Sequence, residues 1–550
     1  MSAIFYHPEA YTTTGPRLMG RHAAGSSFVR GWLQHARTDA FWLQVDHVGH
    51  EQSFVALARQ MGRREPIQVV PKPQMGALQQ VGTVYHPGPS IGLQARLRSL
   101  YGHAGWSLCG ITHTTSSTRA MDSIAEWLTA PVQPWDAVIC TSQAVKQHVL
   151  RIVQAEAEHL RERLGAQRWV LPLLPVIPLG IHTQDFVFDA DQRVRARERV
   201  GAQADTLVVL FMGRLSFHAK AHPLAMYQAL ERAAQRTGRS VLLLECGWHA
   251  NDAIASAFDE AARLAAPSVR TLTLDGRDAS TRDAAWACAD VFCSLSDNIQ
   301  ETFGLVPLEA MAAGLPVVVS DWDGYRDTVR DGVDGFRVPT WLPPAGAGRD
   351  LAFRHAAEID TYDMYCGHTC SVVGVDIDAA TQAFERLFAS PELRQQMGAA
   401  GRARVQALYD WAQIIPQYEA LWAKQDQLRR AQAAPPVGPR PWAARMDPFD
   451  SFAHYATHQL QDQTQLSLVD TDLAKAWQRL QSFKGLRMVQ FANETLPSDD
   501  SVQALLARLT DGPRTVVDLL RETPPARQQV GLRGMVWLIK LGIVRATPLE

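Results

Sequence analysis

Short apolar runs, each followed by a helix-like stretch, recur along the chain up to about residue 430 and constrain its fold more than any other feature. They stand at Ile4–Tyr6, Val81–Tyr85, Ala137–Thr141, Leu207–Gly213, Val241–Cys246, Asp290–Leu295 and Val317–Ser320. Continuous runs of this length are typical of strands buried on both faces of a sheet. Parallel strands need crossover connections, which are usually helices, so the alternation predicts an α/β fold with parallel sheets.

A chain of 550 residues is longer than one hydrophobic core usually serves, so several domains are expected. The run Val176–Phe186 marks the crossing between two Rossmann-like domains, and an Ala-, Pro- and Arg-rich stretch marks a linker. The predicted parts are a first domain over 1–182, a second over 183–404, a closing helix over about 405–428 that packs back on the first domain, a linker over 429–448, and a tail domain over 449–550.

Composition excludes several classes of protein. The formal net charge of -2 gives no global electrostatic case for binding nucleic acid or an anionic membrane. We see neither a leader peptide nor an apolar run long enough to span a bilayer, so a cytoplasmic protein with reduced thiols is expected. Cys366, His368 and Cys370 alternate, but this spacing does not match the usual zinc sites, so they are interpreted as loop residues and no metal is predicted.

The segment Glu301–Ser320, ETFGLVPLEAMAAGLPVVVS, carries two carboxylates between two apolar strands. A helix that begins near Gly304 or Leu305 places Glu301 in the preceding loop and Glu309 in the second turn. Helix starts attract anions and polarised oxygens, and loops after parallel strands line the ligand crevice. A carboxylate such as Glu309 can accept hydrogen bonds from a vicinal diol, as in ribose. The alternative is a capping glutamate and a solvated one.

The segment Phe211–Pro223 places Arg214 and Lys220 in the loop after another strand. A diphosphate leaving group needs cations where its charge develops, and arginine and lysine supply them in different geometries. The alternative is two solvated basic residues, which is the usual state of such side chains.

Together these segments resemble the retaining family 4 glycosyltransferases of the GT-B fold. The family pattern is a Gly-Arg-Leu loop with a downstream lysine, followed by two glutamates eight positions apart with Phe-Gly after the first. The matching residues here are Gly213, Arg214, Leu215 and Lys220, then Glu301, Phe303, Gly304 and Glu309. The resemblance covers roughly residues 1–425 and is specific mainly over 205–340. It implies two Rossmann-like domains facing across a cleft, with a small, mainly helical C-terminal domain in addition.

The resemblance also implies roles for single residues. Arg214 and Lys220 would hold the donor diphosphate, and Glu309 would bind the ribose. Glu301 would hold the transferred sugar. The backbone around Gly213, Phe303, Gly304 and Leu305 would line the same donor site. In the first domain, a glycine-containing loop over Gly20–Phe28, with Gly20 and Gly25, would sit beside the donor phosphate and the acceptor. His113, in the stretch ITHTTSS, would line the sugar site.

The chain departs from the family pattern in a few places. Lys220 lies one residue further from Gly213 than is commonest, and Asp323 stands where a glycine is usual. The loop before Glu301 is longer, and Trp341–Val375 is interpreted as an insertion at the domain edge. The Asp-x-Asp triplets Asp321/Asp323 and Asp376/Asp378 are not interpreted as metal ligands, because the resemblance implies metal-independent transfer without a cofactor.

The resemblance implies transfer of a sugar from a nucleotide-sugar donor to an acceptor hydroxyl, with retained anomeric configuration. The acceptor could be a glycan, a lipid-linked molecule or a small molecule, with at most peripheral membrane contact. Front-face attack and a covalent intermediate both stay open. The rival interpretations are a GT-B sugar-nucleotide epimerase and a catalytically inactive GT-B scaffold.

The tail carries its own helical pattern. Val502, Leu505, Leu506 and Leu509 follow helical spacing, VVDLL and Leu532–Leu541 predict two more helices, and Ile543 and Val544 could begin a strand. This arrangement resembles a winged-helix module. Residues 498–550 hold seven Lys/Arg and six Asp/Glu, a net charge of 7 − 6 = +1. That balance promises no basic face for duplex DNA, so a protein-docking role is expected and nucleic acid is not.

Overall fold

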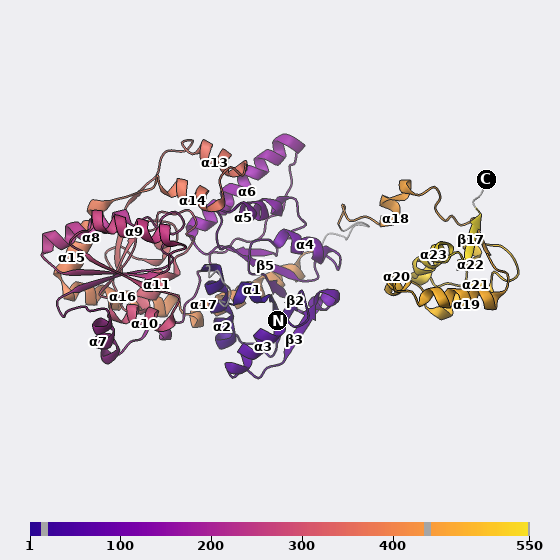
Figure 1. The fold of residues 1–550 in the computed structure, drawn as a ribbon, viewed down its shortest axis with the longest axis horizontal. Helices are drawn as coiled ribbons and strands as arrows, with labels where there is room; N and C mark the ends of the chain where they lie inside the picture. Colours follow the sequence, from indigo (N-terminus) through magenta and orange to yellow (C-terminus); the bar gives the residue numbers. More distant parts are fainter. Residues whose placement is uncertain (13–19, 434–441, 548–550) are drawn as a thin grey trace. The chain divides into compact units, whose positions relative to one another are not determined.

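The computed structural model describes residues 1–12, 20–433 and 442–547. Its contacts divide the chain into two compact units, Met1–Pro441 and Trp442–Glu550 (Figure 1).

The larger unit begins with a six-stranded parallel sheet in the order β3-β2-β1-β4-β5-β6. Its strands are β1 (Ser2–Phe5), β2 (Phe41–Val45), β3 (Ile67–Pro71), β4 (Thr83–Tyr85), β5 (Ser107–Ile111) and β6 (Ala137–Ile139). The helices between them include α1 (Pro8–Tyr11), α2 (Gly20–His35), α3 (Glu51–Gln60), α4 (Ile91–Ser99), α5 (Thr118–Ala125) and α6 (Gln143–Leu164).

A second six-stranded parallel sheet repeats the same strand order, β9-β8-β7-β10-β11-β12. Its strands are β7 (Leu207–Met212), β8 (Val241–Gly247), β9 (Arg270–Asp275), β10 (Val291–Ser294), β11 (Val317–Ser320) and β12 (Gly335–Val338). Its helices are α7 (Ala190–Arg199), α8 (Leu224–Thr237), α9 (Asp252–Ala265), α10 (Ala279–Cys288), α11 (Leu305–Ala312), α12 (Tyr325–Thr328), α15 (Ile377–Ala389) and α16 (Pro391–Leu408). Both sheets have the doubly wound Rossmann order, which confirms the predicted α/β fold of two Rossmann-like domains.

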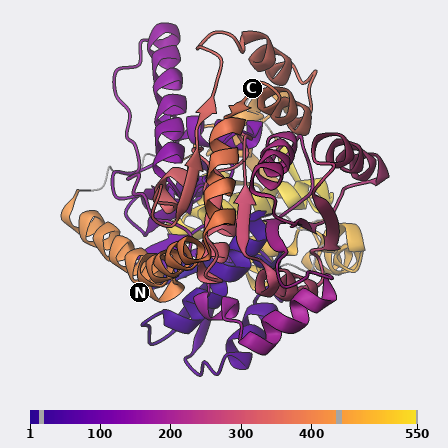
Figure 2. The same ribbon diagram turned by 90° about the vertical axis from the view of Figure 1, so that its left-hand side faces the viewer.

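Helix α17 (Trp411–Ala431) connects the second domain back to the first, where it packs on α2, β4 and β5 (Figures 1 and 2). Trp411 at its start is fully buried. A Cβ on Gly31 or on Gly180 would lie 2.5 Å from the Trp411 ring, so only glycine leaves room for the indole. Buried side chains of both domains and of α17 form one continuous hydrophobic core.

The glycine-containing loop predicted over Gly20–Phe28 is wrong, because α2 covers these residues. The apolar side chains of Phe28, Val29, Trp32 and Leu33 repeat at helical spacing and are buried, which outweighs the helix-breaking tendency of glycine. Gly25 allows close packing with α1, since a Cβ there would lie 2.1 Å from the carbonyl oxygen of Ala10. Residues 13–19, just before α2, lie outside the described residues.

The stretch Trp341–Val375 is an excursion from the second domain. The antiparallel pair β13 (Thr340–Trp341) and β14 (Gly374–Val375) closes its base, and α13 (Arg349–Ala356) and α14 (Tyr362–Cys370) fill it. The loop predicted for Cys366, His368 and Cys370 is also wrong, because all three lie on α14, whose N-cap is Thr361. Cys366 and Cys370 are buried four residues apart on one face, whereas His368 bonds Asp360. The three side chains do not converge.

The smaller unit is mixed in structure. Its antiparallel sheet has the order β16-β15-β17, built from β16 (Arg514–Thr515), β15 (Gln465–Leu468) and β17 (Val544–Thr547). Its helices are α18 (Pro448–Ser451), α19 (Leu473–Lys484), α20 (Arg487–Gln490), α21 (Asp499–Ala507), α22 (Val516–Leu520) and α23 (Pro525–Lys540). Strand β15 was not predicted from the sequence. The winged-helix resemblance and the docking role stay predictions.

In the part of the chain that the structure describes, no helix is both long and apolar enough to cross a bilayer.

Candidate active site

The carboxyl ends of β7 and β10 meet at the centre of the second sheet. These two strands are neighbours although they are far apart in sequence, and the chain runs outward from them in opposite directions. In doubly wound sheets ligands bind outside the strand ends at this reversal of strand order. The loops after β7 and β10 carry the residues that the sequence singled out, so the fold brings the two segments together.

Lys220 and Glu301 form an ion pair across these two loops. The Lys220 Nζ atom lies 2.5 Å from Glu301 Oε2, and the side chains are 22% and 13% exposed. Burial acts to raise the pKa of Glu301, but the Lys220 charge and backbone amides outweigh it, so the pKa is lowered and the group stays a carboxylate. An ammonium has three donors, so the pair leaves Lys220 able to bind an anion as well.

Arg214 lies in the same loop as Lys220, and neighbouring residues fix the position of its guanidinium group. Its Nη2 donates to the Ala219 carbonyl at 2.9 Å and to Gln300 Oε1 at 3.2 Å. Gly213, just before it, has φ of 144°, a conformation that favours glycine. The arginine is thus oriented by neutral acceptors, and its charge is not cancelled by a carboxylate among the described residues.

Two buried residues that the sequence reasoning missed join the loops. Asn298 Nδ2 donates to the His218 carbonyl at 3.0 Å, and Asp297 Oδ1 accepts from the His222 amide at 3.2 Å. Burial raises the pKa of Asp297 to about 7. The sequence signal for them was an Asp-Asn pair separated by two residues from the end of the buried strand β10, where the loop is longer than the family pattern. They hold the Arg214–Lys220 loop against the Glu301 loop.

Helix α11 begins where the sequence predicted, with Gly304 as its N-cap. Gly304 has φ of 82°, and a Cβ there would lie 2.0 Å from the ring of Tyr325, so glycine is required. Phe303 is buried beside it. The first amides of α11, from Leu305 on, have no acceptors within the helix and can bind a ligand.

Glu309 lies one turn into α11 and is half-buried. Burial raises the pKa of its carboxyl to about 7, although the charges of Arg282 and Lys220 act to lower it. Within the described residues no hydrogen bond engages this carboxyl. The Glu309 carboxyl is therefore an unengaged acceptor near the loop that carries Arg214 and Lys220, as a ribose-binding residue needs to be.

The first domain contacts the second at two places. The α6 N-cap, Ser142, donates its hydroxyl to the Thr302 carbonyl at 2.8 Å, and the Gln143 amide donates to Asp327 at 2.7 Å. His113 lies in the loop after β5 and is half-buried. Its neighbour Thr114 contacts the Tyr362 hydroxyl of α14 at 3.0 Å. The excursion therefore touches the loop that carries His113.

Gly25 is buried in the packing of α1 and α2. Its predicted role beside the donor phosphate stays a prediction.

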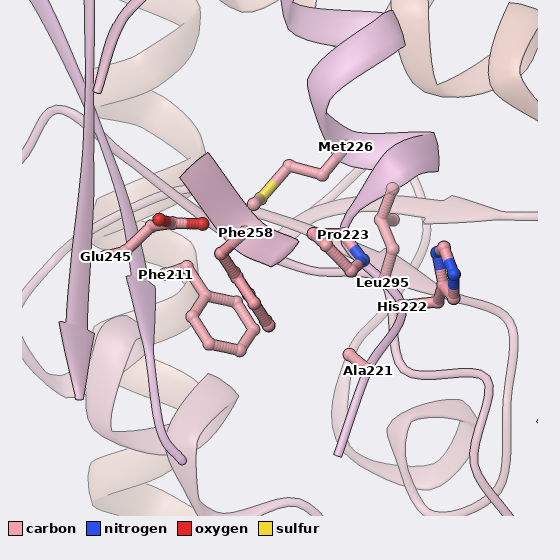
Figure 3. A pocket seen from close by; sticks show the side chains of 8 residues that line it. All are labelled: Phe211, Ala221, His222, Pro223, Met226, Glu245, Phe258 and Leu295. Carbon is pink, nitrogen blue, oxygen red and sulfur yellow. The ribbon is translucent and has the colours of Figure 1, made fainter. Parts of the chain in front are cut away.

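A small pocket includes residues 221–223, which follow Lys220 in the sequence, in its lining (Figure 3). Its lining residues are Phe211, Ala221, His222, Pro223, Met226, Glu245, Phe258 and Leu295. Figure 3 shows the Glu245 carboxyl pointing into this mainly apolar space. Glu245 accepts a hydrogen bond from the buried Tyr227 hydroxyl at 2.6 Å, and burial raises its pKa to about 7. Among the described residues that line the pocket there is no lysine or arginine, so it does not suit a diphosphate.

The architecture of two parallel sheets, each with its strand order reversing at the centre and joined by a returning C-terminal helix, is that of the GT-B proteins. Residues 206–348, which contain the site, match the family model described as Glycosyl transferases group 1. This part of the chain is therefore a group 1 glycosyltransferase domain.

Curated relatives carry names of the same kind. The chain is 30% identical over 271 residues to the D-inositol 3-phosphate glycosyltransferase of Streptomyces bingchenggensis, which covers 46% of this chain and 56% of that protein. It is 30% identical over 259 residues to the phosphatidyl-myo-inositol mannosyltransferase of Mycobacterium tuberculosis (strain H37Rv), covering 46% and 55%. The chain thus spans about half the length of the curated relatives it matches.

Among solved structures, Anabaena HepE in complex with UDP and glucose matches with a TM-score of 0.49 and 14% identity, over 77% of this chain and 99% of that one. Sucrose-phosphate synthase from Thermosynechococcus elongatus matches with a TM-score of 0.47 and 18% identity, over 78% and 99%.

Proposed function

We propose that the protein is a glycosyltransferase that moves a sugar from a nucleotide-sugar donor to an acceptor hydroxyl and retains the anomeric configuration. The observation that carries this proposal is the meeting of Arg214, Lys220, Glu301 and Glu309 at the carboxyl ends of β7 and β10, inside the matched domain. The two cations and the amides at the helix start suit the diphosphate of a nucleotide sugar, and the unengaged carboxylate suits its ribose.

Arg214 and Lys220 would stabilise the diphosphate as the bond to the sugar breaks. Charge that develops on the leaving group is best met by cations already in place, because they need no reorganisation during the reaction. Lys220 is already fixed by Glu301, and Arg214 by Gln300. No metal or other cofactor is needed in this proposal, since the two side chains and the amides at the start of α11 supply the positive charge.

Glu309 would accept hydrogen bonds from the ribose, and Glu301 would orient the transferred sugar together with the backbone at Phe303 and Gly304. His113 would act from the first domain on the sugar or the acceptor. The acceptor would be a glycan, a lipid-linked molecule or a small molecule. The names of the relatives, an inositol phosphate glycosyltransferase and a phosphatidyl-inositol mannosyltransferase, lend support to small or lipid acceptors.

A panel of UDP- and GDP-sugars, incubated with the purified full chain, tests the proposal. We expect release of nucleoside diphosphate from one donor class, and loss of that release in Lys220→Ala. A nucleotide sugar that returns as an epimer with no glycosylated product would favour an epimerase. Tight donor binding with no turnover under any condition would favour an inactive scaffold.

A further inference from the structure

The loop after β11 lies directly against the segment proposed to hold the transferred sugar. A Cβ on Gly324 would lie 2.5 Å from the Phe303 Cα atom, so the backbones of these two loops touch. Asp323 precedes Gly324 and is close enough to Glu301 for their charges to interact. Asp323 is therefore beside the donor-sugar segment, on the side that faces α6 of the first domain.

Asp323 has a backbone conformation that favours glycine. Its φ is 45°, and of the non-glycine residues that the structure describes, only Asp323 and Glu358 have a positive φ. The family pattern has a glycine at this position. A non-glycine residue in a backbone conformation that favours glycine points to a use for its side chain.

The Asp323 carboxyl is poorly satisfied within the protein. Its Oδ1 lies 3.4 Å from the Ser142 hydroxyl, but that hydroxyl has one hydrogen, which it donates to the Thr302 carbonyl at 2.8 Å. Asp323 Oδ2 is buried and has no hydrogen-bond partner among the described residues. Burial, and then the charge of Glu301, raise the pKa of Asp323 well above its usual value, although the Ser142 hydroxyl and the Gly324 amide act to lower it. A buried polar atom without a partner costs free energy unless a ligand supplies one.

Asp327, a carboxylate near Asp323, has a structural contact with which Asp323 can be compared. Asp327, on α12, accepts the Gln143 amide at 2.7 Å, at the start of the 22-residue helix α6. A carboxylate at a helix N-terminus is stabilised by the unsatisfied amides and the helix dipole. Asp327 thus joins the two domains, whereas Oδ2 of Asp323, four residues earlier, has no hydrogen-bond partner among the residues that the structure describes.

We propose that Asp323 is a specificity-determining residue, whose carboxyl hydrogen-bonds a ring hydroxyl of the transferred sugar. This inference rests on the proposed function. It predicts that the protein distinguishes donors that differ in the orientation of one ring hydroxyl, and that this discrimination depends on the side chain at position 323.

The test measures kcat/KM for pairs of epimeric donors, UDP-glucose with UDP-galactose and GDP-mannose with GDP-glucose, in the full chain. Asp323→Gly should fold at least as well as the unsubstituted protein, because glycine adopts this φ without strain. We expect the ratio between the preferred donor and its epimer to fall about tenfold or more, since one directed hydrogen bond is lost. Affinity for the free nucleoside diphosphate should change less than about twofold, because the contact is to the sugar.

Two further variants separate this role from a structural one. Asp323→Asn keeps a donor and an acceptor, so it should retain part of the discrimination. Asp327→Asn weakens the contact between the domains and should lower kcat/KM equally for both epimers, which leaves their ratio unchanged.

The inference is overturned if the unsubstituted protein uses both epimers equally, or if Asp323→Gly leaves the ratio unchanged while donors are still turned over. Release of nucleotide from no donor at all would instead refute the proposed function, and this inference with it.

Discussion

Nucleotide affinity should depend on pH through Glu309. Burial raises the pKa of this carboxyl to about 7 in the free protein. If Glu309 accepts hydrogen bonds from the two ribose hydroxyls, the bound form needs the carboxylate, so binding must displace the proton. The affinity contributed by Glu309 should therefore rise as the pH rises through 7.

The magnitude follows from this pKa. The ionised fraction increases about tenfold between pH 6 and pH 8 for a group with a pKa near 7, from roughly 0.09 to 0.91. The Glu309-dependent part of the affinity should rise by the same factor, which is about 1.4 kcal/mol. At pH 7 binding should release about half a proton.

Calorimetric titration with UDP and GDP, in buffers of different ionisation enthalpy, measures both the affinity and the proton release. Glu309→Gln is the matched control, because it keeps the size and polarity of the side chain but cannot ionise. Titration of the nucleotide's own phosphate affects both proteins, so the difference between them isolates Glu309. Identical pH profiles in the two proteins would refute the role of Glu309.

The raised pKa of Glu309 also predicts how folding stability depends on pH. The contribution of Glu309 to stability should fall over the pH range in which its contribution to nucleotide affinity rises. The folded pKa of Glu309 lies above the unfolded value of 4.5, so ionisation opposes folding. Its contribution to stability should fall as the pH rises from about 4.5 to about 7. The stability of Glu309→Gln relative to the unsubstituted protein should rise over that interval, which urea unfolding at two pH values can measure.

Four other predictions concern the site and the tail. Arg214→Ala or Lys220→Ala should lower turnover by about 2–4 kcal/mol of transition-state stabilisation with little effect on folding; near-normal turnover in both would exclude a role on the leaving group. Glu301→Ala should spare nucleotide affinity and reduce transfer, and the reverse pattern in calorimetry would exchange its role with that of Glu309. His113→Ala should leave nucleotide affinity unchanged and reduce transfer, whereas unchanged transfer kinetics would make it a structural residue. The isolated tail, residues 442–550, should not bind duplex DNA tightly, and salt-sensitive submicromolar binding would contradict this expectation.

Much of the fold could be predicted because its strands are strongly apolar and its crossovers are helical. The runs at Leu207–Gly213 and Val317–Ser320 became β7 and β11 almost residue for residue. The order of the strands could not be deduced from these runs, since periodicity carries no information about which strands are neighbours. Helix α2 was missed because its glycines suggested a loop, while the need for Gly25 lies in a distant contact with Ala10.

The sequence singled out the charged residues that meet at the ends of β7 and β10, but it gave no information on their surroundings. The pairing of Lys220 with Glu301 joins positions 81 residues apart, and only the adjacency of β7 and β10 brings them together. The contacts of Ser142 and Gln143 with the second domain likewise depend on how the domains close. Strand β15 was missed because it is four residues long and lies far from its partners in sequence.

The most direct test of the account is an experimental structure of the full chain with a bound nucleoside diphosphate. The account predicts a diphosphate within hydrogen-bonding distance of Arg214 and Lys220, and a ribose whose hydroxyls contact Glu309. A nucleotide bound at the carboxyl ends of β1 and β4 in the first sheet, or one bound in the second domain without contact to these three side chains, would contradict it.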